Sequence, residues 1–262
     1  MNWKDLEVSA NFPAEIVCEE VGTGETCITL TWTKGEYKAP ALNVTWAVPL
    51  VDIQYEWYPL CGRDRALRTD WDAAIHTSFS TGAPVFCFYN EEGQNRLTIA
   101  ISEVRLEALH SYGVHEEDGT LLCCLKLPLP MTGSAERYSV TLLRLRENMR
   151  YEAALRQVAA WWERVSDTHP MPVPTAARLP MYSTWYSFHQ ETVAADLEAA
   201  CVLAAQDGFR TVIVDDGWQT SDCTRGYGYC GDWQPAPEKI PDMRAHVARV
   251  HALGMKYMLW YS

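Results

Sequence analysis

The hydrophobic periodicity of this chain changes once, near residue 148, and this change limits the folds that it can adopt. Before that point apolar side chains alternate with polar ones, which is the period of a strand with one buried face. The clearest runs are Ile28/Leu30/Trp32, Val44/Trp46/Val48, Val51/Ile53/Tyr55/Trp57 and Ile99/Ile101, and such runs are separated by the turn signals Thr23-Gly24, Glu92-Gly93 and Asp118-Gly119. Residues 1–147 are therefore predicted to form an antiparallel β-sandwich domain, with Trp71, in a polar stretch, at the surface.

A helix and a proline-rich stretch follow this predicted domain. Apolar residues recur at three- and four-residue spacing, as expected for an amphipathic helix: Tyr151, Leu155, Val158, Trp162 and Val165. The three prolines of residues 169–174 then prevent helix and favour an extended chain. Residues 148–178 are accordingly predicted to be a linker helix and a proline-rich linker.

From residue 179 to residue 262 the pattern alternates between strand and helix. Strands are predicted at 182–188, within 211–219 and from 256 to 260. Two helical faces lie between them, Val193/Leu197/Cys201/Ala204 and Met243/Val247/Val250/Leu253, ending at Gly208 and Gly254. This order predicts parallel βα units.

The second of these strands ends in an unusual cluster, Asp215-Asp216-Gly217-Trp218-Gln219. Polar residues at the carboxyl end of a parallel strand are where barrels and doubly wound sheets bind ligands. Carboxylates accept hydrogen bonds from sugar hydroxyls, and an indole covers the apolar face of a sugar ring. The two neighbouring carboxylates do not fit an acid/base pair, because such groups flank the scissile bond of a glycoside. The alternative interpretation is one carboxylate that caps a turn and one that is solvated.

Three further aromatic positions are candidates for the same site. Trp233 lies in a polar loop, where it either contacts a ligand or acts as a plug that ties the loop to the domain. Trp185 and Trp260, near the ends of the first and third predicted strands, either fill the core or form a wall of the site. The loop also contains the spacing Gly226-x-Gly228-x-x-Gly231, but no helix follows it, which argues against a dinucleotide site.

The composition excludes several classes of function. The net charge of −12 argues against nucleic acid or an anionic membrane as a partner. No stretch reaches 18 consecutive apolar residues, and residues 1–7 lack the apolar core of a signal peptide, so a cytoplasmic location is expected. The nine cysteines are scattered, as small reduced core residues are. Cys223 and Cys230 share a loop without other ligands at metal spacing, so neither a metal nor a cofactor is expected.

Several motifs of the second half, taken in order, resemble those of glycoside hydrolase family 36, the melibiase-type α-galactosidases. They are residues 183–186 (Ser-Thr-Trp-Tyr), 214–218 (Val-Asp-Asp-Gly-Trp), 231–233 (Gly-Asp-Trp), 239–241 (Lys-Ile-Pro) and 251–260. The first half is similar in size and position to that family's N-terminal β-supersandwich. The resemblance implies a multidomain β plus α/β fold, in which residues 179–262 are the first three strands and two helices of a truncated TIM-type (β/α)8 barrel.

The resemblance also implies an activity, that of a retaining exo-α-galactosidase acting on oligosaccharides of the melibiose and raffinose type. Asp215 and Asp216 would bind hydroxyls of the terminal galactose, and Trp233, Trp185 and Trp260 would line its pocket. The family's nucleophile and acid/base are aspartates on later strands, so they are expected beyond Ser262, and the chain itself is expected to be inactive. A homo-oligomer is compatible with the full-length enzyme. The alternatives are a related α-glycosidase, a raffinose-type galactosyltransferase, or a non-catalytic galactoside-binding module.

Overall fold

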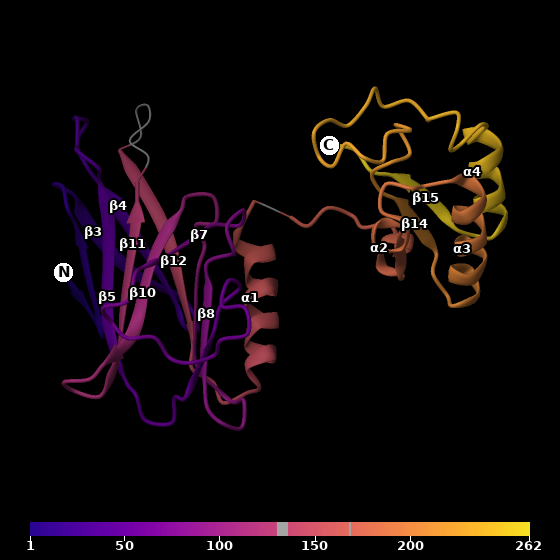
Figure 1. Cartoon of the computed structure of the whole chain (residues 1–262). Helices are drawn as coiled ribbons and strands as arrows, with labels where there is room; N and C mark the ends of the chain where they lie inside the picture. The colour runs from indigo at the N-terminus through magenta and orange to yellow at the C-terminus, as the bar shows by residue number, and fades with distance from the viewer. Residues whose placement is uncertain (130–135, 168) are drawn as a thin grey trace. The chain divides into compact units, whose positions relative to one another are not determined.

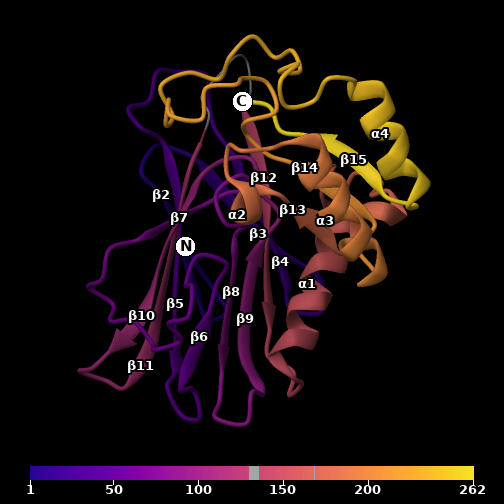
Figure 2. The same ribbon diagram turned by 45° about the vertical axis from the view of Figure 1, so that its right-hand side comes forward.

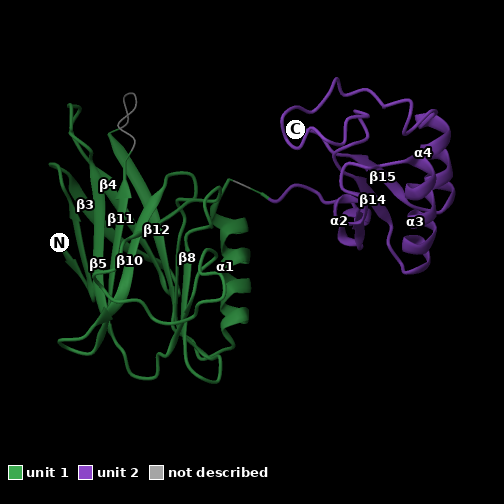
Figure 3. Ribbon diagram, in the orientation of Figure 1, with its two compact units in different colours: residues 1–169 green, residues 170–262 purple. Residues whose placement is uncertain are grey.

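The structure is a computed structural model that describes residues 1–129, 136–167 and 169–262. The chain divides into two compact units, unit 1 (Met1–His169) and unit 2 (Pro170–Ser262) (Figure 3). Residue 168, within the range expected as a linker, lies outside the described residues. Each unit has its own hydrophobic core.

Two antiparallel sheets, each of six strands among the described residues, make up most of unit 1 (Figure 1). In spatial order the first sheet contains β1 (Asn2–Trp3), β2 (Leu6–Ala10), β5 (Ala41–Pro49), β11 (Thr120–Pro128), β10 (Ala108–His115) and β7 (Ile75–Thr77). The second contains β3 (Glu15–Gly22), β4 (Glu25–Thr31), β12 (Arg137–Leu145), β9 (Asn95–Ile101), β8 (Val85–Tyr89) and β6 (Tyr55–Trp57). The predicted antiparallel β-sandwich is confirmed.

Tight turns at the predicted positions set the register of three hairpins. Gly24, Gly93 and Gly119 have φ of 71°, 73° and 67°, a left-handed conformation that glycine adopts without strain. They connect β3 to β4, β8 to β9 and β10 to β11. The predicted run 51–57 is wrong in its first half. Val51 is 84% exposed in a turn, and only Tyr55–Trp57 pairs as a strand.

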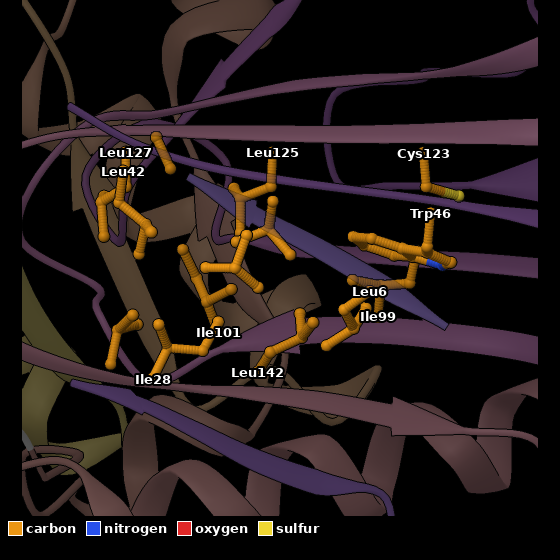
Figure 4. Close-up of a cluster of buried hydrophobic side chains, with 14 of the residues drawn as sticks. Leu6, Ile28, Leu42, Trp46, Ile99, Ile101, Cys123, Leu125, Leu127 and Leu142 are labelled. Atoms are coloured by element: carbon orange, nitrogen blue, oxygen red, sulfur yellow. The ribbon is translucent and has the colours of Figure 1, made fainter. Parts of the chain in front are cut away.

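The inward faces of the two sheets form one apolar core (Figure 4). Alternate residues of the long strands point into it, as in Val44, Trp46 and Val48 of β5. Because the strand period is two, one register places every apolar residue of a strand on the buried face. Trp71 is 67% exposed, as expected from its polar surroundings.

Helix α1 (Tyr151–Val165) packs on unit 1 beside β8 and β9 (Figure 2). Its most buried residues are Ala154, Val158 and Trp161, which join a cluster with Val85, Ala100, Leu143 and Leu145. The helix predicted for the linker range is therefore a covering layer of the sandwich unit. The described proline-rich part that follows, residues 169–180, forms no helix or strand except a short 3₁₀ turn, η1 (Thr175–Arg178).

Unit 2 contains a parallel sheet of three strands among the described residues, β13 (Met181–Ser183), β14 (Thr211–Val214) and β15 (Lys256–Leu259). Helix α3 (Ala194–Gln206) connects the first strand to the second, and α4 (Met243–Ala252) connects the second to the third. Leu197 and Cys201 of α3, Val212 of β14 and Val250 of α4 meet in its core. The predicted order of parallel βα units is confirmed.

The first strand of unit 2 is shorter than predicted. Only Met181–Ser183 is extended, and residues Trp185–Phe188 form a single helical turn, α2. Thr184 starts this turn, because its carbonyl accepts from the amides of Ser187 and Phe188 (3.1 and 2.9 Å). Its buried side chain meanwhile accepts from the amide of Asp215 at 3.0 Å. Trp185 thus begins a helical turn instead of ending a strand.

Among the described residues, no helix is both long and apolar enough to cross a membrane.

Candidate functional site

The candidate site is the turn that follows β14. Hydrogen bonds to β13 and β15 hold this strand on both sides, and Val212 and Val214 are fully buried. The chain then reverses at Gly217, whose φ is 114°. A Cβ atom there would lie 2.2 Å from the backbone oxygen of Gln190, so only glycine fits. The turn is thus fixed by backbone packing against the segment that follows α2.

The first carboxylate of the turn, Asp215, is half-buried. Its Oδ1 accepts from the backbone amide of Asp216 at 2.8 Å, which caps the turn locally. Its amide donates to the Thr184 hydroxyl, which fixes Asp215 relative to the end of β13. The second carboxylate oxygen has no hydrogen-bond partner within the described part of the chain. Asp215 therefore retains an oxygen that can accept from a ligand.

The second carboxylate, Asp216, is 4% exposed and is held by side chains on both oxygens. Its Oδ2 accepts from Gln190 Nε2 at 2.9 Å, and its Oδ1 accepts from Gln219 Nε2 at 2.6 Å and pairs with the Arg225 guanidinium. Burial alone would raise the pKa of this carboxyl. The hydrogen bonds from Arg225, Gln219 and Gln190 outweigh that effect, so its pKa lies below the ordinary value. Asp216 is therefore ionised at neutral pH.

Arg225, Gln190 and Gln219 were not among the predicted site residues. Gln190 and Arg225 lie 26 and nine positions from Asp216 in loops without periodicity, so no sequence pattern connects them to it. Gln219 lies only three positions from Asp216, and a side-chain amide can reach back across a turn over that distance. Its contact with Asp216 could therefore have been predicted from the sequence.

Lys239 also stabilises the turn at Gly217. Its ammonium is buried and donates to the backbone oxygens of Gln190 (2.7 Å) and Gly217 (2.8 Å). The lysine therefore joins the two chain segments that approach each other at Gly217. Lys239 belongs to the motif at 239–241, but its position in the sequence does not indicate this structural role.

Two of the predicted tryptophans meet in an aromatic cluster beside the turn. Trp233 is half-buried, and its ring centroid lies 6.1 Å from Trp218, 5.7 Å from Trp260 and 4.9 Å from Tyr261. Trp218 is fully buried and donates its indole N–H to the Trp260 oxygen at 3.1 Å. The plug interpretation of Trp233 thus describes its packing, while its partial exposure leaves part of the side chain accessible.

Trp185 lies outside this aromatic cluster and lines a cavity of its own. Its ring is stacked at a tilt on His189, with centroids 3.9 Å apart, and faces Tyr227 at 6.2 Å. With residues 186–191 and Cys223 it lines a cavity of about 490 Å³. Gln190 lines this cavity and also donates to Asp216, but Asp215, Asp216, Trp233 and Trp260 do not line it. Within the described ranges, no group of three or more His, Cys, Asp or Glu side chains is placed to hold a metal.

The fold of this chain is similar to that of known proteins, although its sequence matches none of them closely. No protein-family model matches the sequence, and no curated protein does. Among solved structures, the chain is similar to the GH36 α-galactosidase AgaB of Geobacillus stearothermophilus (16% identity, TM-score 0.51). It is similar to a double variant of AgaA from the same organism in complex with raffinose (17% identity, TM-score 0.51). Both matches cover 98% of this chain and 38% of the other chain. At such identities the similarity establishes a shared fold over the matched part.

Proposed function

We propose that this chain is the N-terminal part of a family 36 α-galactosidase, and that the turn after β14 binds the terminal galactose of an α-galactoside. In this proposal unit 1 is the supersandwich and unit 2 is the start of a (β/α)8 barrel. The observation that carries the proposal is a pair of carboxylates at the carboxyl end of a parallel strand, beside a half-buried tryptophan. The fold shared with two α-galactosidases of that family supports it.

The two carboxylates are suited to different hydroxyls. Among the described residues, Asp215 has one oxygen without a partner, and Asp216 Oδ2 accepts a single hydrogen bond, from Gln190. A carboxylate oxygen has two acceptor positions, so each aspartate can accept from one sugar hydroxyl. Trp233 would cover the apolar face of the ring, and Trp185 and Trp260 would line the pocket. Charged acceptors in a partly buried site form strong hydrogen bonds with hydroxyl groups.

Catalysis needs a second set of carboxyls. A retaining glycosidase uses two of them, about 5–5.5 Å apart around the scissile bond. Asp216 is held ionised by Arg225, which makes it unsuited to donate a proton to a leaving group. We therefore assign this chain the sugar-binding carboxylates, and we propose that the nucleophile and the acid/base belong to sequence that follows Ser262.

Calorimetric titration of the 262-residue chain with melibiose tests the binding part of the proposal. We expect binding of melibiose, no binding of maltose, whose terminal sugar is glucose, and at least tenfold weaker binding for Asp215→Asn, since a hydrogen bond to a charged group contributes about 1.5–3 kcal/mol. Asp196→Asn is the matched control, because Asp196 is an exposed carboxylate on α3. Equal affinity of Asp215→Asn and the unchanged chain would contradict the assignment.

A chromogenic α-galactoside tests the catalytic part. We expect no hydrolysis and no galactosyl transfer by the chain. Turnover that disappears in Asp215→Asn would show that the catalytic carboxyls are already present, and would overturn their assignment to later sequence. If the extended reading frame contains no further carboxylates on barrel strands, binding without turnover would instead identify a galactoside-binding module.

A further inference from the structure

Arg225 is the most unusual charged residue of unit 2. It lies in the stretch between β14 and α4, where residues 215–242 form no helix or strand. Most residues next to it in the sequence are exposed, yet the Arg225 side chain is only 1% exposed. Arginine is almost never buried to this extent unless it is paired. The reason for its burial is therefore to be found in what the guanidinium contacts.

The guanidinium joins the loop to the end of β14. Its Nη2 pairs with Oδ1 of Asp216, and its Nη1 donates to the backbone oxygens of Gly226 (3.1 Å) and Tyr229 (2.6 Å). It lies 5.7 Å from the centroid of the Tyr229 ring. The loop thus closes around its own arginine.

Asp222 braces the same loop from its outer side. Its carboxylate accepts from the Tyr229 hydroxyl at 2.6 Å and from the Thr224 amide at 2.9 Å. Beyond Tyr229, the loop continues to Trp233 in the aromatic cluster. Gln190 Nε2 donates both to Asp216 Oδ2 and to the Gly226 oxygen at 2.7 Å, so one amide ties the carboxylate to the loop. The position of Asp216 and the position of the loop are consequently coupled.

We propose that Arg225 is the positioning residue of the galactose site, and this inference rests on the function proposed above. By occupying Oδ1 together with Gln219, it leaves Oδ2 as the oxygen of Asp216 that accepts a sugar hydroxyl. By binding the Gly226 and Tyr229 carbonyls, it fixes the loop that leads to Trp233. Arg225 itself has no role in contact with the sugar. Arg225 keeps Asp216 charged and holds the loop that carries Trp233, so that both residues contribute to one site.

The charges around the pair are consistent with this role. Asp216 pairs with Arg225 from the loop, Asp215 precedes it in the turn, and the Lys239 ammonium donates to the oxygen of the next residue, Gly217. Asp222 is the further charged group near Arg225. Arg225 and Lys239 are the cations of this set, and Lys239 donates to backbone oxygens only. Without Arg225, a largely buried carboxylate would lack a paired cation and would protonate more readily.

Carbon-13 NMR titration of the Asp216 carboxyl tests the proposal directly, in the unchanged chain, in Arg225→Met and in Arg225→Lys. We expect the Asp216 titration midpoint to rise by at least one pH unit in Arg225→Met, and to stay near its original position in Arg225→Lys. Arg249→Met is the matched control, because Arg249 pairs with Glu198 in the same unit but is 55% exposed. An unchanged midpoint in Arg225→Met would overturn the proposal.

Melibiose affinity as a function of pH provides the second readout. In the unchanged chain the affinity should be nearly constant from pH 7 to pH 5. In Arg225→Met it should fall with the fraction of protonated Asp216, by about tenfold at one pH unit below the midpoint that the NMR titration gives. Arg225→Lys should restore a constant profile with an affinity lowered a few-fold, because an ammonium lacks the planar fork that binds Asp216 and two carbonyls together. A pH-dependent loss in Arg225→Lys equal to that in Arg225→Met would contradict the proposal.

Two further outcomes are distinguishable. An unchanged chain that binds no galactoside would refute the proposed function, and the Asp216 titration would then decide the Arg225–Asp216 coupling separately. If Arg225→Met does not fold, Arg225→Lys still tests the inference through hydrogen exchange. Protection of the Gly228 amide, which donates to the Arg225 oxygen at 3.1 Å, should fall in that variant. Full protection together with unaltered affinity would overturn the positioning role.

Discussion

The two units bury their residues in different ways. Unit 1 fills the space between two antiparallel sheets with side chains such as Phe86, Phe88 and Ile101, which are fully buried. Unit 2 has three short strands, and at their carboxyl end it buries a carboxylate, a guanidinium and an ammonium around one turn. Apolar packing is tolerant of position because it is non-directional, whereas the charged turn requires each donor to meet its acceptor. In the function proposed above, the sandwich serves as a scaffold and the sugar-binding residues lie in unit 2.

The largest expected effect concerns the core of unit 1. Replacing Phe88 by alanine removes a fully buried ring next to Tyr112, so unit 1 should lose about 3–5 kcal/mol of unfolding free energy. Hydrogen exchange resolved by segment measures this loss, and protection of residues 181–259 should not change. A loss of protection in both units to the same extent would show that they unfold together, and the contrast between them would fail.

The turn of unit 2 provides the opposite test. Gly217→Ala places a methyl group 2.2 Å from the Gln190 oxygen at a φ of 114°. We therefore expect unit 2 to lose about 3 kcal/mol of unfolding free energy and the chain to lose melibiose binding. Gly208→Ala is the control, because Gly208 also has a positive φ of 91° but open space around it. Its cost should be about 1 kcal/mol, with binding retained. Similar losses in the two variants would exclude the close approach as the cause.

A pH dependence should distinguish unit 1. Burial, with a smaller effect of Arg68, lowers the pKa of His110 to about 3, whereas an unfolded histidine titrates near 6.5. Below pH 6.5 the unfolded chain binds a proton that the folded chain does not, so stability falls as the pH decreases. Between pH 8 and pH 5 this amounts to about 2 kcal/mol.

Urea denaturation at several pH values measures this dependence. His110→Asn, which keeps an amide near the Tyr112 hydroxyl but cannot titrate, should reduce the slope by that amount. An unaltered slope in the variant would assign the pH dependence to other groups.

The smallest expected effect concerns a brace between α3, α4 and β15. His246 is fully buried, with Nδ1 at 2.7 Å from Glu198 and Nε2 at 3.0 Å from the Tyr257 hydroxyl. Tyr257→Phe removes one hydrogen bond, so unit 2 should lose about 1 kcal/mol without any change in melibiose affinity. Thermal unfolding and calorimetry measure the two quantities. A changed affinity would mean that this brace is coupled to the turn after β14.

Much of the fold could be predicted from local patterns. Alternation of apolar residues located strands β4, β5 and β9 of unit 1, and the glycines at 24, 93 and 119 located three of its hairpin turns. The helical faces of α3 and α4 were also predicted, although the buried His246 of α4 was not, because a histidine does not contribute to an apolar period. The extent of strand β13 was wrong because Thr184 starts a helical turn through hydrogen bonds that no alternation of residue types reveals.

The candidate site was predictable only in part. The position of Asp215 and Asp216 at the end of a buried strand followed from composition around residues 211–219. The sequence did not indicate which of the two carboxylates would be bound by other side chains of the protein. Asp216 is engaged by Arg225 and Gln190, whereas Asp215 caps its own turn. The assignment of both to galactose binding remains a prediction, as do the roles of the three tryptophans.

The sequence by itself determined the change from strand periodicity to βα units and the place where two carboxylates follow a buried strand. Both depend on residues that are neighbours or a few positions apart, and local spacing encodes such relations directly. The tertiary structure alone decided that α1 covers the sandwich and that Arg225, Gln190 and Lys239 meet around Gly217. These groups lie in loops that have no period, and their hydrogen bonds form only once β14 and the segments around it have been brought together.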